Sequence, residues 1–320
     1  MKPPEQAAAA GRQVAVFGEC MIELQGEPFG PLRQSYGGDT LNTAVYLARL
    51  GARHGIRACY ATGLGDDVYS QGLVQRWQAE GIDTSLVRHL AGRLPGMYSI
   101  HLDASGERQF AYWRDSSAAR SYFDVPQTPL EQAGADIDTL YFSGISLAIL
   151  PDAARLRLLD LARRLRARGG RVVFDNNYRP RLWPDAEVAQ AWFAQAFACT
   201  DIALVTADDE RLLHGLPTLD AAVARSLALP ASEVVIKRGA QPVIVRRADG
   251  TTVEVAAVPV ARVVDTTAAG DSFAAGYLCA RMIGRDVESA AKLGHALAAE
   301  VIQHAGAIIP ATATDRWNPG

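Results

Sequence analysis

Asp265–Gly276 reads DTTAAGDSFAAG, a run of small residues between the segment Ala261–Val264 and an apolar stretch that continues to Met282. We expect the segment before the run to be a strand and the stretch after it to be a helix. Small residues at a strand-to-helix turn let backbone amides approach an anion, and the N-terminus of the helix adds a favourable electrostatic field. The run therefore predicts a binding site for a phosphate-sized anion.

A carboxylate stands within this run, in the first turn of the predicted helix. Asp271 would repel a phosphate, so it is poorly explained as an anion ligand, but it is well suited to take a proton from an attacking hydroxyl. The alternative is that Asp271 only stabilises its own helix, because acidic side chains favour first turns. On the residues alone, both interpretations stay open.

Short β-branched runs alternate with helical stretches along the rest of the chain. The runs lack polar alternation, which is typical of strands in a sheet covered by helices on both faces. The pattern predicts a doubly wound α/β fold with a mostly parallel sheet. We expect strands at Val14–Phe17, Arg171–Asp175, Ile202–Val205 and Val234–Ile236, and helices at Thr40–Leu50, Tyr69–Glu80 and Ala153–Arg168.

Two segments break this alternation and look extended. Tyr98–Arg114 has the pattern of a hairpin with its turn at 103–106, and residues 23–36 are rich in glycine and proline. We therefore expect a small β-sheet lid built from about 20–36 and 97–114. A second hairpin, Val243–Val253, is expected at the edge of the main domain. The predicted organisation is a single domain over 13–312, with a mobile N-terminal tail at 1–12 and a C-terminal tail at 313–320.

Composition excludes several classes of partner. The chain of 320 residues carries 32 Lys and Arg against 35 Asp and Glu, a net charge of −3, which argues against a nucleic-acid partner held by bulk phosphate attraction. No apolar run approaches the roughly 20 residues that a membrane span requires, so we expect no membrane partner. The four cysteines are far apart and residues 1–11 lack a signal-peptide pattern, which predicts a cytoplasmic protein.

Two signatures of one enzyme family are present in the right order. The run at 265–276 matches the second signature of the PfkB, or ribokinase-like, family of carbohydrate kinases, and Gly37–Ala44, GGDTLNTA, resembles the first, except that Thr40 stands where Gly, Ala or Pro is usual. Within that family the chain most closely resembles the 2-keto-3-deoxygluconate kinases of Gram-negative bacteria. The segments that carry this resemblance are Gly18–Leu24, Arg93–Tyr98, Tyr112–Arg114, Leu140–Pro151, Phe174–Trp183 and Val234–Ala240.

This resemblance implies a ribokinase-like fold and an enzyme of sugar-acid catabolism. ATP would phosphorylate 2-keto-3-deoxy-D-gluconate at its 6-hydroxyl, giving the 6-phosphate and ADP, with Asp271 as the base. One alternative is a kinase for a neutral sugar such as fructose or ribose, and another is a non-catalytic sugar sensor on the same scaffold. Gly63–Val68 lacks the third glycine of a dinucleotide fingerprint and no GxxxxGK[ST] run is present, which removes Rossmann dehydrogenases and P-loop kinases.

The resemblance also implies which residues bind the sugar. Arginine suits bidentate recognition of a carboxylate, so Arg114 and Arg179 fit an acidic sugar, although arginines in general more often lie on the surface or in ion pairs. The predicted substrate-binding residues are Gly38, Asp39, Asn42, Tyr98, Tyr112, Arg114, Asn177 and Arg179.

The nucleotide side is predicted in the same way. Asp209 lies with Thr206 where the family has its NxxE motif, and it would act through water on the Mg²⁺ that ATP carries, with no direct metal ligand expected; an acidic helix start is the plain alternative. Asp265 and Thr267 are candidates for a monovalent cation such as K⁺. A homodimer through the lid is expected. The predicted residues for ATP and the anion are Thr206, Lys237, Gly239, Ala268, Ala269 and Gly270.

Overall fold

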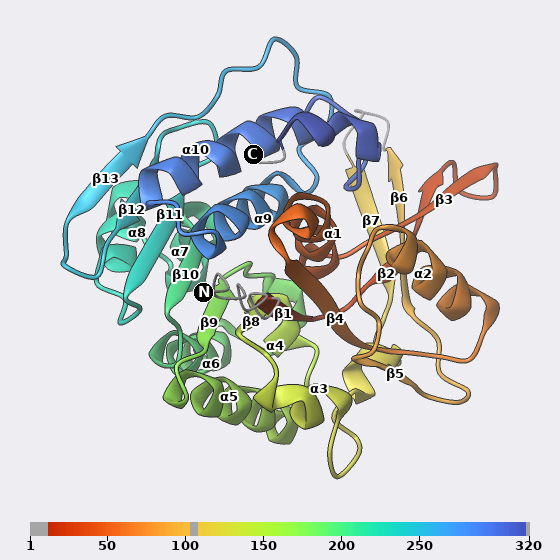
Figure 1. Ribbon diagram of the computed structural model, residues 1–320. Coiled ribbons are helices and arrows are strands. Elements are labelled where there is room, and N and C mark those ends of the chain that lie inside the picture. Colours follow the sequence, from red (N-terminus) through yellow and green to blue (C-terminus); the bar gives the residue numbers. More distant parts are fainter. Residues whose placement is uncertain (1–11, 103–107, 318–320) are drawn as a thin grey trace, which may run out of the picture.

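The computed structural model describes residues 12–102 and 108–317. Nine strands form the main sheet, in the order β13-β12-β11-β10-β9-β8-β1-β4-β5 (Figure 1). Neighbours from β11 to β5 pair in parallel, whereas β12 and β13 form an antiparallel hairpin at one edge. The strands are β1 (Arg12–Phe17), β4 (Ile56–Leu64), β5 (Val87–His89), β8 (Thr139–Ser143), β9 (Arg171–Asp175), β10 (Ile202–Thr206), β11 (Glu233–Lys237), β12 (Val243–Arg246) and β13 (Thr252–Val255).

Successive strand residues point into two different cores. In β1, Val14 and Val16 belong to one core and Ala15 and Phe17 to the other, and all four are fully buried. Because side chains alternate across a strand, a strand with helices on both faces needs apolar residues at every position. This explains the continuous apolar runs of the sequence and confirms the predicted doubly wound α/β fold.

Helices cover both faces of the main sheet (Figure 1). One face carries α1 (Asp39–Gly51), α2 (Val68–Ala79), α9 (Ala269–Met282) and α10 (Val287–Val301). The other carries α4 (Gly144–Ala148), α5 (Asp152–Ala167), α6 (Ala186–Ala198), α7 (Ala207–His214) and α8 (Leu219–Leu227). The remaining short helices are α3 (Pro129–Gln132), η1 (Ala52–His54), η2 (Ala118–Ser121), η3 (Ala133–Ala135), η4 (Pro180–Leu182), η5 (Ala311–Ala313) and η6 (Asp315–Trp317).

The predicted lid is a separate four-stranded sheet beside the main sheet, in the order β3-β2-β6-β7 (Figure 1). Two hairpins build it, and they join because β2 pairs in parallel with β6. The turn predicted at 103–106 lies outside the described residues. The strands are β2 (Met21–Gly26), β3 (Leu32–Gly37), β6 (Gly96–Leu102) and β7 (Arg108–Trp113).

One predicted strand is wrong. Ala261–Val264 belongs to an irregular segment between β13 and α9, and Val263 and Val264 are about half exposed. The amides of Val264 and Asp265 both donate to the carbonyl of Ile302, just past α10, so these donors are satisfied outside any sheet. The β-branched pair therefore lines an open loop rather than a core.

The two ends differ in how far the prediction can be compared. Most of the predicted N-terminal tail, 1–11, lies outside the described residues, and β1 begins at Arg12. Near the other end, η5 and η6 continue to Trp317, and Thr314 between them is buried. Within the two described ranges, no helix combines the length and apolar character needed to cross a membrane.

Candidate active site

A cavity of about 1500 Å³ opens where the carboxyl ends of the main-sheet strands face the lid. Ligands of doubly wound proteins bind at this edge of the sheet. Every residue predicted to bind sugar, ATP or the anion lines this cavity, as do Asp209 and Asp271. The structure thus brings together side chains that the sequence spreads from Gly38 to Asp271.

The N-termini of α1 and α9 open into this cavity. Gly38 precedes α1 and Ala268 precedes α9, and neither helix has a side-chain hydrogen bond capping its first turn. By contrast, Asp67 caps α2 and Asp286 caps α10. The first amides of a helix have no partner within it, so α1 and α9 leave donors for a ligand.

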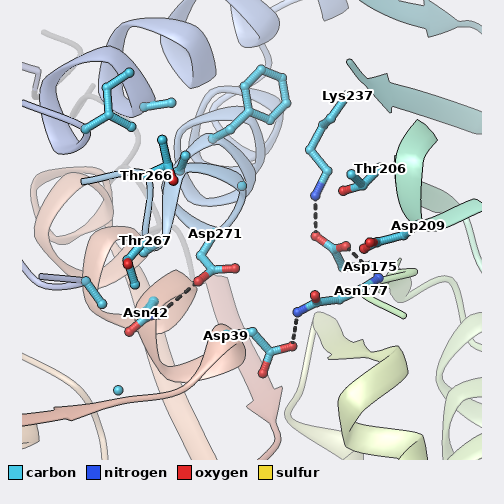
Figure 2. Close-up of a pocket in the computed structure, with 18 of the residues that line it drawn as sticks. Asp39, Asn42, Asp175, Asn177, Thr206, Asp209, Lys237, Thr266, Thr267 and Asp271 are labelled. Atoms are coloured by element: carbon cyan, nitrogen blue, oxygen red, sulfur yellow. Dashed lines mark hydrogen bonds and ion pairs between the residues drawn. The ribbon is translucent and has the colours of Figure 1, made fainter. Parts of the chain in front are cut away.

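Asp271 lies in the first turn of α9 and faces α1. The side-chain amide of Asn42 donates a 2.8 Å hydrogen bond to its Oδ2 (Figure 2). Burial and the neighbouring carboxylate of Asp39 raise the pKa of Asp271 to about 7, against the opposing effect of the Asn42 bond. A carboxyl group with such a pKa can accept a proton near neutral pH.

Asp39 is held from the opposite side of the cavity. The side-chain amide of Asn177 donates to its Oδ2 at 2.6 Å (Figure 2). Burial raises the pKa of Asp39. Asn177 has a positive φ of 21°, a conformation that asparagine tolerates better than most residues, and its backbone amide donates to Asp175 Oδ1 at 3.3 Å.

The backbone at the start of α9 decides which of its amides are free. Ala268 occupies the left-handed region, with φ 60° and ψ 15°, and this turn starts the helix. The amide of Ala269 already donates to the carbonyl of Thr266 at 3.2 Å. We therefore expect the amides of Ala268 and Gly270, rather than all three, to face an anion.

Both predicted sugar-binding arginines have carboxylate partners. Arg114 is buried and its Nη2 is paired with Glu19. Arg179 is half exposed, and its Nη1 lies 3.3 Å from Asp209. The alternative noted for arginines, an ion pair within the protein, is thus what the structure shows for both, although both also line the cavity.

Residues 12–314 match the pfkB family of carbohydrate kinases. The chain belongs to this family. It is 48% identical over 302 residues to 2-dehydro-3-deoxygluconokinase of Escherichia coli K12. The matched region covers 93% of this chain and 97% of that protein. The enzyme of the same name from Dickeya dadantii is 47% identical over 302 residues, with the same shares. The fold is similar to aminoimidazole riboside kinase from Salmonella enterica, crystallised with aminoimidazole riboside and an ATP analog, at a TM-score of 0.80 and 27% identity, covering 96% of this chain and 99% of that one.

Two cavity tyrosines of this pfkB-family protein stand on the lid. The rings of Tyr98 and Tyr112 stack with centroids 5.8 Å apart. The hydroxyl of Tyr98 donates to the buried carboxylate of Glu23, so towards a ligand it offers its ring and its oxygen lone pairs.

The turn between β10 and α7 places the motif that departs from the family pattern. The amide of Thr206 donates to Asn176 Oδ1 at 2.9 Å, and Asn176 Nδ2 donates to the Thr206 carbonyl at 3.2 Å. Asp209 lies in the first turn of α7, as the plain alternative expected, and burial raises its pKa. Gly239, with φ 60°, makes the turn after β11.

Asp265 and Thr267 lie at the end of the loop that leads from β13 into α9. The amide and hydroxyl of Thr267 donate to Asp265 Oδ1 at 2.9 and 2.6 Å, and the amide of Gly306 donates to Oδ2 at 3.0 Å. Across the described ranges, no group of three or more His, Cys, Asp or Glu side chains could hold a metal ion.

Sequence reasoning missed Asp175. This residue ends β9, is 3 % exposed, and pairs with the ammonium of Lys237 at 2.7 Å (Figure 2). The pair lies beside the N-terminus of α9, because a Cβ on Gly270 would lie 3.6 Å from Lys237 Nζ. The available signal was a lone acidic residue at the carboxyl end of a strand that is apolar from Val172 to Phe174, at the edge where this fold binds ligands.

Proposed function

We propose that this pfkB-family protein transfers the γ-phosphoryl group of ATP to the 6-hydroxyl of 2-keto-3-deoxy-D-gluconate, the sugar acid also called 2-dehydro-3-deoxygluconate. The observation that carries the reaction type is Asp271, a carboxylate with a pKa near 7 beside the open N-terminus of α9. The substrate is supported by the 48% identity, over nearly the full length, to a 2-dehydro-3-deoxygluconokinase.

The residues divide the chemistry between base and charge stabilisation. Asp271 takes the proton of the 6-hydroxyl, whose oxygen bonds to the γ-phosphorus as the bond to the β-phosphate bridging oxygen breaks and ADP leaves. Lys237 and the amides of Ala268 and Gly270 stabilise the negative charge on the transferring group. Mg²⁺ bound by ATP would neutralise phosphate oxygens, and Asp209, which lines the same cavity, would contact its water shell.

The acidic substrate is matched by the arginines. Arg114 and Arg179 line the same cavity as Asp39 and Asn42, which suit sugar hydroxyls. A guanidinium can bind a second carboxylate while it keeps its first partner, because it has five donors in a planar fork.

A substrate panel tests the proposal. Release of ADP is measured with ATP and Mg²⁺ for 2-keto-3-deoxygluconate, fructose and ribose, and we expect turnover of the acid sugar to exceed that of both neutral sugars by at least about a hundredfold. Arg114→Ala and Arg179→Ala should raise KM for the acid sugar more than KM for any neutral sugar accepted. A preference for fructose or ribose would favour the neutral-sugar alternative, and no ADP release from any sugar would favour a sensor.

We further propose a homodimer through the lid. Trp113 of β7 is 57% exposed and lies on the face of the lid opposite Phe110 and Tyr112, which line the cavity, so this large aromatic side chain is available for a second copy. Sedimentation should give a dimer for the wild type and a monomer for Trp113→Lys, with Leu156→Lys on α5, equally exposed but distant from the lid, remaining dimeric. A monomeric wild type would contradict this.

A requirement for K⁺ at Asp265 and Thr267 stays a prediction. Replacing K⁺ by tetramethylammonium in the same assay should lower turnover, whereas equal rates in the two salts would show that no small monovalent cation is needed.

A further inference from the structure

Four segments connect the lid to the main domain within the described residues, and they meet at Glu19. Glu19 itself lies on the first segment, between β1 and β2. Gly38 connects β3 to α1, and residues 90–95 lead from β5 to β6, which begins at Gly96. Arg114 and Ser117 follow β7 on the way back to the main domain.

Each of the other three segments contacts Glu19. Its Oε2 accepts from Arg114 Nη2, and its Oε1 accepts from the hydroxyl of Ser117. A Cβ on Gly38 would lie 2.1 Å from the Glu19 carbonyl oxygen, and a Cβ on Gly96 would lie 2.9 Å from Glu19 Oε1. Gly38 therefore needs glycine because the Glu19 backbone fills the space, and Gly96 packs closely on the Glu19 carboxylate, so Glu19 lies between all four connections.

The contact between Glu19 and Arg114 is fully enclosed as well. Glu19 is 2% exposed, Ser117 is 4% and Arg114 is 7%. A buried charge is tolerated only when a partner and hydrogen bonds compensate it, so the carboxylate restricts the guanidinium to few orientations. An ion pair with a half-exposed arginine, such as Arg179 with Asp209, imposes less restriction.

Arg114 keeps a donor for a ligand in this fixed orientation. The residue lines the cavity, and within the described residues its side chain makes a hydrogen bond through Nη2 alone. A guanidinium has five N–H donors in a planar fork, so donors remain for an acceptor oxygen of a ligand in the cavity.

We infer that Glu19 is a positioning residue for the acid sugar: it holds Arg114, which lines the cavity, in a fixed orientation at the base of the lid. This inference rests on the proposed function, because it needs a sugar acid in the cavity. It assigns Glu19 no contact with the reacting atoms. Removing the carboxylate should therefore weaken binding of the sugar while leaving ATP and the base untouched.

The test compares Glu19→Gln with Glu19→Asp, which keeps the charge but moves it away from Arg114 because the side chain is one methylene group shorter. KM for 2-keto-3-deoxygluconate should rise about tenfold in both, whereas KM for ATP and kcat should stay within about threefold of wild type. Glu233→Gln is the matched control. Glu233 also pairs with a mostly buried arginine, Arg281, but it lies at the end of β11 opposite the cavity. It should lower thermal stability without changing either KM.

A double variant shows whether Glu19 acts through Arg114. In an Arg114→Gln background, Glu19→Gln should change the KM for the sugar acid by less than about twofold, because the group that it positions is already absent. An undiminished effect in that background would overturn the inference, and so would a wild-type sugar KM in Glu19→Asp, the variant to rely on if Glu19→Gln does not fold. Failure of the proposed function would be seen separately, as a wild-type protein that does not turn over the sugar acid.

Discussion

Asn42 donates a 2.8 Å hydrogen bond to Asp271 although 229 positions separate the two residues. Asn42 belongs to the first turn of α1 and Asp271 to the first turn of α9, and these helices pack against each other over one face of the main sheet. The bond fixes one carboxylate oxygen of Asp271, so the other is free to face the cavity. The two sequence signatures are therefore one physical unit: the carboxylate that we propose as the base, and the amide that orients it.

Asp271→Asn should abolish most of the activity. Because asparagine cannot accept the hydroxyl proton, we expect kcat to fall about 10³-fold, while calorimetric binding of the sugar stays within about threefold. Asn42→Ala serves as the comparison, since it leaves the base in place but unoriented and should cost less. Near-wild-type turnover in Asp271→Asn would show that another group is the base.

The activity should depend on the ionisation of Asp271. Its pKa of about 7 means that the carboxyl is protonated, and inactive as a base, below that pH. We expect kcat/KM to rise with pH up to about 7 and then to level off. Burial contributes most to the raised pKa of Asp271. The carboxylates of Asp39 and Asp175 raise it further, whereas Asn42 and Lys237 lower it.

Asp175→Asn provides a test of that electrostatic origin. Removing the carboxylate lowers the pKa of Asp271 both directly and by freeing the charge of Lys237, so the acidic limb of the profile should move down by about half a pH unit or more. Asp208→Asn, which removes an exposed carboxylate in the first turn of α7, should leave the limb in place. Identical limbs in wild type and Asp175→Asn would contradict the assignment of Asp271 as the titrating group.

The same carboxyl should make the folded protein less stable at higher pH. The pKa rises from an ordinary 3.8 to about 7 on folding, so the folded state holds the proton more tightly and the unfolded state releases it first. Stability from this group is full below about pH 4 and is lost as pH rises to about 7. As the pH is raised from 5 to 8, the free energy of unfolding of Asp271→Asn should therefore increase by about 2 kcal/mol relative to that of the wild type, measured by urea unfolding. A gain that does not change with pH would argue against this linkage.

Ala268 should tolerate only glycine. Its φ of 60° is easily reached by glycine, is strained for alanine, and is strongly disfavoured for a β-branched residue. Ala268→Gly should keep kcat within about twofold and the melting temperature within a few degrees, whereas Ala268→Val should lose several degrees and most turnover as the anion-binding turn distorts. Equal behaviour of the two variants would mean that the turn adapts freely.

The helices and strands that depend on local sequence pattern were predicted best. The helix expected at Thr40–Leu50 is Asp39–Gly51, and the strand expected at Arg171–Asp175 has those bounds. Such elements are specified by apolar periodicity, a pattern to which every residue of the element contributes. The strand expected at Ala261–Val264 failed because β-branched residues also line open loops, and no local signal shows whether a strand has a partner.

The missed residues were single charges with distant partners. Glu19 pairs with a residue 95 positions away, and Asp175 with one 62 positions away. Each follows or ends a strand and has no neighbouring motif that points to its partner. Likewise, the resemblance pointed to Arg114 and Arg179 but could not show that each already has a carboxylate beside it.

The lid is made from two separate excursions of the chain, and this has a consequence for the order of assembly. Neither hairpin is large enough to persist alone in water, since two-stranded sheets are marginal at best. β2 and β6 can pair only after β1, β4 and β5 have brought their starting points together. The lid should therefore form last and open first, and its amides should exchange with deuterium long before those of β1 and β8. A substrate that bridges the lid and the main sheet would slow that exchange, so the exchange rate of the lid amides would report whether the cavity is occupied.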